Sequence, residues 1–85
     1  MTNYVLAKEK DGGGYLLHEV GLGGEIDVEN SLTAPGKNLE DFGDFCEEKG
    51  VKFAERDLLI CSSALGHGLP VTGKELRWFR RRLAA

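Results

Sequence analysis

Residues 72–83 read Thr-Gly-Lys-Glu-Leu-Arg-Trp-Phe-Arg-Arg-Arg-Leu, and composition, charge and helix signals all change at this stretch. It contains the only tryptophan and five of the eleven basic residues of the chain. Residues 72–85 have five basic residues and one acid, a net charge of +4, whereas residues 1–71 have six basic residues and thirteen acids, a net charge of −7. A block of like charge of this kind indicates a binding surface.

The same stretch predicts a helix over residues 72–84. Thr72 is a favourable N-cap, and Glu75, three residues later, completes the pattern of a capping box. At about 100° per residue, the apolar residues of the stretch form one stripe. Another side of the helix forms the predicted basic face, which consists of Lys74, Arg77, Trp78, Arg81 and Arg82. A tryptophan among cations can stack on a base or a guanidinium and can anchor an interface. The alternative is that Trp78 covers the sheet.

The N-terminal half of the chain has the pattern of strands. Apolar residues alternate from Thr2 to Lys10, from Tyr15 to Val20 and from Glu25 to Glu29, with glycine-rich turns between these segments. This pattern predicts a three-stranded antiparallel meander. Residues 30–37 are expected to be a loop because they contain a Pro-Gly pair. The 85 residues are expected to form a single domain, residues 1–85, with a small core.

A second helix is predicted over residues 39–49. Asn38 is a good N-cap, and Gly50 followed by an apolar residue is a C-terminal stop. The acids of this segment all fall on the side opposite its apolar stripe and form the predicted acidic face, which consists of Glu40, Asp41, Asp44, Glu47 and Glu48. Acids are disfavoured at the C-terminal end of a helix, so helix stability does not account for the last two. Three hypotheses remain open: this face meets the basic face of a second copy, it imitates nucleic acid, or it binds a basic partner.

Residues 54–65 have two interpretations. Apolar residues recur every three or four positions from Ala54 to Leu65, with Gly66 as a stop, and this spacing favours a helix. The rival is a buried strand through residues 58–61, because a short apolar run cannot be assigned by periodicity alone. The predicted fold class is α+β, in which the N-terminal meander is packed by two helices, at 39–49 and 72–84, or by three if 54–65 is also helical.

The sequence also contains the pattern G-x-x-x-x-G-K of a phosphate-binding loop, from Gly68 to Lys74. Glu75 follows where that motif needs a hydroxyl for Mg²⁺, and no strand feeds directly into the loop. The capping box accounts for the same residues. We therefore expect no nucleotide to bind here.

Two other groups of residues have the chemistry of a metal or catalytic site. His18, Cys46, Cys61 and His67 match zinc ligands by type, but no two of them have the close spacing of a structural zinc site. Cys61, Ser62 or Ser63 with His67 as base could provide a nucleophile, but no orienting acid or oxyanion-hole motif is recognisable. The sequence therefore predicts no metal, no cofactor and no enzymatic activity.

Residues 69–83 resemble the opening helix of helix-turn-helix regulators of the Cro/repressor class, including some antitoxins. The resemblance covers Leu-Pro-Val-Thr-Gly-Lys-Glu-Leu-Arg-Trp-Phe-Arg-Arg-Arg-Leu. In that family the next segment supplies the turn and the recognition helix, and this sequence ends at Ala85 before either. The resemblance therefore carries over no DNA-reading residue.

Together these patterns predict a small non-enzymatic regulatory or adaptor protein. No apolar run is long enough to span a membrane, and no secretory signal is recognisable, so we expect a cytoplasmic protein with reduced cysteines. We expect it to bind a protein partner, with a second copy as one candidate, through its charged helix faces. The alternative hypothesis is a nucleic-acid-binding or transcription-regulator-associated domain that uses the basic face.

Overall fold

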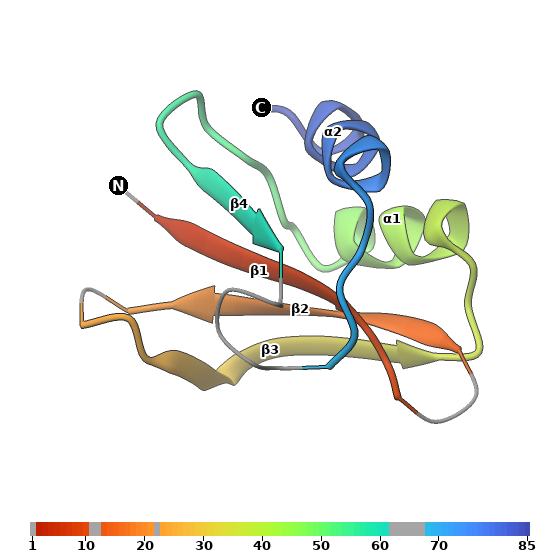
Figure 1. Cartoon of the computed structure of the whole chain (residues 1–85). Helices are drawn as coiled ribbons and strands as arrows, with labels where there is room; N and C mark the ends of the chain where they lie inside the picture. The colour runs from red at the N-terminus through yellow and green to blue at the C-terminus, as the bar shows by residue number, and fades with distance from the viewer. Residues whose placement is uncertain (1, 11–12, 22, 62–67) are drawn as a thin grey trace.

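The computed structural model describes residues 2–10, 13–21, 23–61 and 68–85. Within these residues it is an α+β fold in which two helices cover one face of a four-stranded mixed sheet (Figure 1). The elements in chain order are β1 (Asn3–Lys8), β2 (Gly14–Val20), β3 (Ile26–Pro35), α1 (Leu39–Glu48), β4 (Leu58–Cys61) and α2 (Gly73–Arg82).

The predicted meander is present, and the sheet extends beyond it. Strands β1, β2 and β3 pair antiparallel in sequence order, as the alternating patterns predict. Strand β4 adds to the other side of β1 in parallel, so the order across the sheet is β3-β2-β1-β4. The connection from β3 to β4 passes through α1, which lies over the sheet (Figure 1).

The prediction of a helix over residues 54–65 is wrong, and the rival strand through residues 58–61 is correct. A tight turn precedes the strand, because the Asp57 carboxylate accepts the Ala54 amide at 2.8 Å and the Asp57 amide donates to the Ala54 carbonyl at 3.0 Å. The backbone of residues 58–61 then pairs with the edge of β1 that faces away from β2. A helix would leave these backbone groups of β1 without hydrogen-bond partners. Residues 62–65 of the predicted helix lie outside the described residues.

The predicted loop at residues 30–37 is also corrected, because β3 continues to Pro35. Leu32 pairs with Leu17, and Ala34 pairs with Tyr15, so the second half of β3 contributes side chains to the core. Pro35 is the last residue of an edge strand, where the missing amide proton costs no ladder hydrogen bond.

The predicted N-caps of both helices and the stop at Gly50 are confirmed, whereas α1 ends at Glu48 and α2 at Arg82, before the predicted residues 49 and 84. Asn38 Oδ1 accepts the Asp41 amide at 2.8 Å, and α1 closes on Gly50, whose φ of +84° suits glycine. At the start of α2, Thr72 Oγ accepts the Glu75 amide at 3.1 Å while Glu75 accepts the Thr72 amide at 2.9 Å. This reciprocal pair is the capping box that the sequence indicates.

The core lies between the helices and the sheet, and aromatic rings hold it together. Phe42 of α1 and Phe79 of α2 are both fully buried and stack with ring centroids 5.7 Å apart. Phe42 also stacks on Tyr15 of β2, and Phe53 meets the edge of Phe79. The last residues of the chain are tied to the same region, because the Ala85 amide donates to the Phe53 carbonyl at 2.9 Å.

Replacing Phe79 by alanine should remove a large part of the stability of the fold. Phe79→Ala leaves a cavity between both helices and the segment before β4, and such changes cost about 3–5 kcal/mol. Phe45→Ala is the matched control, because Phe45 is only partly buried and should cost less. Urea unfolding measures both values. Equal, small losses in the two variants would contradict this packing.

Candidate interaction surface of helices α1 and α2

The side chain of Trp78 crosses from α2 to α1 and rests on Gly43. A Cβ atom placed on Gly43 would lie 3.3 Å from Cζ3 and Cη2 of the indole, so the ring occupies the space that this glycine leaves open. Gly43 is buried, and Trp78 is partly buried against the core. One side of the Trp78 ring therefore packs against α1, whereas the alternative drawn from the sequence was that Trp78 covers the sheet.

Residues of the predicted acidic face and of the predicted basic face form ion pairs with each other within one chain. Arg82 donates from Nη2 to Asp44 Oδ1 at 2.8 Å and from Nη1 to Glu47 Oε2. The hydrogen bond from Arg82 to Glu47, and then the charge of Arg82, lower the pKa of Glu47 below its ordinary value of 4.5. The ion pair with Arg82 therefore accounts for an acid at residue 47, near the C-terminal end of α1.

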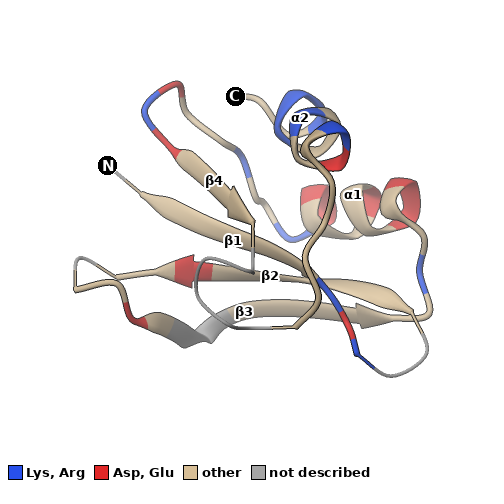
Figure 2. Cartoon of the chain, viewed as in Figure 1, with Lys and Arg blue, Asp and Glu red and all other residues tan. Residues whose placement is uncertain are grey.

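The other cations of the basic face are exposed and unpaired. In the described part of the chain, the ion pairs join Lys8 to Glu75 and Arg82 to Asp44 and Glu47, and none involves Lys74, Arg77 or Arg81. These three cations and Trp78 line a shallow hollow of about 200 Å³. Figure 2 shows the concentration of basic residues on α2 beside the acids of α1.

The acids of the acidic face have different neighbours. Asp44 and Glu47 pair with Arg82, and Glu40 lines a groove between the two helices. Asp41, Asp44 and Glu48 line a hollow that Lys37 and Phe45 complete. Asp44 therefore belongs both to the ion pair with α2 and to this hollow.

The groove between the helices lies at their N-terminal halves. It has a volume of about 260 Å³ and is lined by Leu39, Glu40, Lys74, Glu75 and Trp78.

The carboxylate of Glu75 has partners within the chain. Tyr15 donates its hydroxyl to it at 2.7 Å, and the Lys8 ammonium lies at 3.3 Å. Burial opposes ionisation of Glu75, but the hydrogen bonds from Thr72, Tyr15 and Lys8 outweigh it and lower the pKa. Burial, the bond to Glu75 and its charge raise the pKa of Tyr15 to about 12.

The phosphate-loop pattern serves a structural purpose. The backbone amide and carbonyl of Leu69 both bond to Lys8, each at 2.9 Å, so this amide is not available to a phosphate. Glu75 closes the capping box. Leu69 and Glu75 of the pattern are therefore both used in contacts within the chain.

The candidate metal and nucleophile residues are distributed over different parts of the fold. His18 follows core residue Leu17 on β2 and therefore lies on the opposite face of the sheet, where its Nδ1 bonds to Ser31 Oγ. Cys46 is inside the core, and burial raises the pKa of its thiol to about 12. Cys61 donates to the Val71 carbonyl at 3.5 Å. His67, Ser62 and Ser63 lie outside the described residues, and the described ones contain no group of three metal-ligating side chains.

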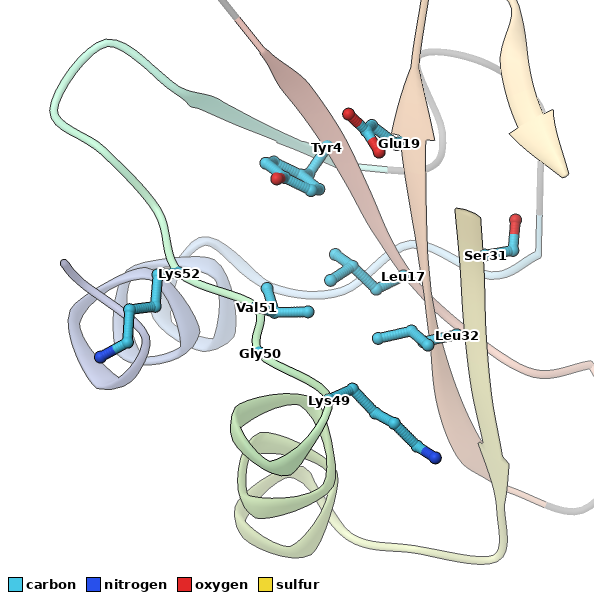
Figure 3. A pocket seen from close by; sticks show the side chains of 9 residues that line it. All are labelled: Tyr4, Leu17, Glu19, Ser31, Leu32, Lys49, Gly50, Val51 and Lys52. Atoms are coloured by element: carbon cyan, nitrogen blue, oxygen red, sulfur yellow. The ribbon is translucent and has the colours of Figure 1, made fainter. Parts of the chain in front are cut away.

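A further hollow, of about 370 Å³, lies where α1 ends over the sheet. Figure 3 shows Leu17, Leu32 and Val51 pointing into it, with Tyr4 and Glu19 at one end and Lys49 at the other. Its residues come from β1, β2, β3 and the segment after α1, so no local sequence pattern could have identified it. The other residues that line it are Ser31, Gly50 and Lys52.

No protein-family model matches the chain, and no curated protein or solved structure matches it either. Among the described residues, neither helix has the length and apolar character needed to cross a bilayer. The charges and grooves of the chain itself are therefore the basis for its functional assignment.

Removing Arg82 should restore the ordinary titration of Glu47. In Arg82→Gln the pKa of Glu47, measured by NMR, should rise from its lowered value toward 4.5. A lowered pKa in the folded state stabilises the fold above the ordinary pKa, and this stabilisation is lost as the pH falls through the folded value. The wild type should therefore lose more stability than Arg82→Gln on acidification below about pH 4.5.

The control for this measurement is Arg80→Gln. Arg80 is on the same helix but donates to the backbone carbonyl of Glu55, which does not titrate. Its replacement should leave the pKa of Glu47 unchanged. An unchanged Glu47 pKa in Arg82→Gln would show that the ion pair between α1 and α2 does not form in solution.

Proposed function

We propose that this chain is a non-enzymatic, cytoplasmic regulatory or adaptor domain that binds an acidic segment of a protein partner. The binding surface is the free basic face, defined as Lys74, Arg77 and Arg81 together with the exposed side of Trp78. One observation carries the proposal: these cations have no carboxylate at ion-pair distance in the described structure, whereas Arg82 of the same helix is paired with two.

Helix stability explains only one of these three cations. Cations are favoured near the C-terminal end of a helix, where Arg81 lies, but Lys74 is in the first turn of α2 and Arg77 is in its middle. Lys74, Arg77 and Arg81 are three and four residues apart, so their like charges repel by a few tenths of a kcal/mol for each pair. A ligand of opposite charge would relieve this repulsion.

The charges beside the free basic face favour a protein over a nucleic acid. Glu40, Asp44 and Glu47 lie on the neighbouring helix, and the whole chain has a net charge of −3. A phosphate backbone that follows α2 would approach these carboxylates. A protein segment can direct its acids at α2 and place neutral or basic residues against α1, so it suits a surface of mixed sign.

A second copy of the chain is one partner of this kind. Asp41 and Glu48 are exposed and do not pair with Arg82. A dimer would have to use these acids, because Asp44 and Glu47 already have a cation in their own chain. Sedimentation at low and high salt measures self-association directly.

The proposal predicts binding that depends on the position of the cations and not only on net charge. Trp78 is the only tryptophan, so its fluorescence reports directly on this surface. An acidic peptide without aromatic residues should bind, and Arg77→Glu with Arg81→Glu should weaken that binding at least tenfold. Affinity should also fall as salt is added, because exposed charges are screened.

The control double variant is Lys10→Glu with Lys37→Glu. Both lysines are exposed and lie outside α2, and each substitution changes the charge by −2, as each arginine replacement does. It should keep the peptide affinity within about twofold, since the local contacts are unchanged. Equal losses in the two double variants would refute a specific surface. Tighter binding to a DNA duplex than to the peptide, with a steep salt dependence, would support the nucleic-acid hypothesis instead.

A further inference from the structure

The groove between Leu39 and Trp78 has an apolar interior despite the charged residues in its lining. Its accessible interior surface belongs to apolar atoms. The reason is visible in the contacts of Glu75, whose carboxylate oxygens are turned to Tyr15, Lys8 and the Thr72 amide. Leu39 and Trp78 are only partly buried there.

The groove is large enough for one apolar side chain. Its volume is about 260 Å³, and a cavity of about 150 Å³ lined by apolar side chains accepts benzene. A leucine or phenylalanine side chain would fit, and it would cover Leu39 and the adjacent edge of Trp78. Buried aromatic contacts of this kind commonly dominate the energy of an interface.

The groove is also continuous with the free basic face. Lys74 and Trp78 line both the groove and the hollow that contains Arg77 and Arg81. A segment that places an apolar side chain against Leu39 would therefore lie beside three unpaired cations. The positive charge of these cations favours a partner in which acidic residues flank the apolar residue.

We propose that the groove binds one Leu- or Phe-sized side chain of the partner, and that acidic residues flanking this anchor pair with Lys74, Arg77 and Arg81. The inference rests on the proposed function and specifies the partner sequence further. The two exposed leucines among the described residues do not fit this description. Leu69 lies between Gly68 and Pro70, and Leu58 follows Arg56 and the buried Asp57.

Two peptides of equal charge test the anchor. Both are acidic and lack aromatic residues, and one has a central leucine where the other has serine. The leucine peptide should bind about tenfold more tightly, since burial of a leucine side chain is worth at least that factor. It should also shift the emission of Trp78 to shorter wavelength more than the serine peptide does.

Leu39→Ala should reduce this preference to about twofold or less. The preference is a ratio of two affinities within one variant, so a change in overall stability affects both peptides alike. Val51→Ala is the control, because Val51 also packs partly buried against the core but lines the separate hollow in Figure 3. It should keep the tenfold preference.

The outcomes separate the two proposals. If both peptides bind equally and Arg77→Glu with Arg81→Glu abolishes binding, the anchor is wrong and the free basic face remains. If neither peptide binds at low salt, the proposed function is wrong, and the anchor with it. A leucine preference that persists in Leu39→Ala would show that the leucine binds elsewhere than in this groove. A dimer that closes the groove in the free protein would show that a second copy, and not an acidic partner segment, occupies it.

Discussion

The contact between the indole of Trp78 and the bare Cα of Gly43 determines how α1 and α2 lie against each other. A side chain at residue 43 would meet the ring at 3.3 Å and the Cγ of Arg82 at 3.5 Å. A glycine inside a helix costs about 1 kcal/mol relative to alanine, so this position carries a cost that the packing offsets. The close approach brings Arg82, one turn after Trp78, to Asp44 beside Gly43 and to Glu47 one turn further along α1.

This contact divides the charges of the chain into two groups. Arg82, Asp44 and Glu47 join the helices by ion pairs, in addition to the stacked rings of Phe42 and Phe79. Lys74, Arg77 and Arg81 have no such partner in the described structure. The internal contacts leave the free basic face and the apolar groove beside it accessible on α2. The proposed recognition of an acidic segment with an apolar anchor is based on these two features.

Local rules were sufficient where the structure depends on neighbours in sequence. The caps at Asn38 and Thr72, the stop at Gly50 and the meander all follow from residues within a few positions of one another. β4 could not be settled in this way, because its hydrogen-bond partners are in β1, more than fifty residues earlier in the chain. The continuation of β3 to Pro35 likewise depends on pairing with β2.

The candidate site shows the same limit. The residues of the charged faces could be grouped by helical periodicity, but the pairing of Arg82 with Asp44, 38 residues away, could not be derived from it. Gly43 in the middle of a predicted helix was the available signal, since an unfavourable residue at such a position suggests a packing reason. The lone tryptophan on the other helix was the natural candidate to fill that space.

The most direct test of this account is an NMR measurement of nuclear Overhauser effects between Gly43 and Trp78. Strong cross-peaks are expected from the α protons of Gly43 to the ring protons on Cζ3 and Cη2 of Trp78, because these carbons lie against the glycine. Absence of these cross-peaks, with both residues assigned and the protein folded, would contradict it. In that case the helices would not be joined through this contact, and the division between paired and free cations would no longer hold.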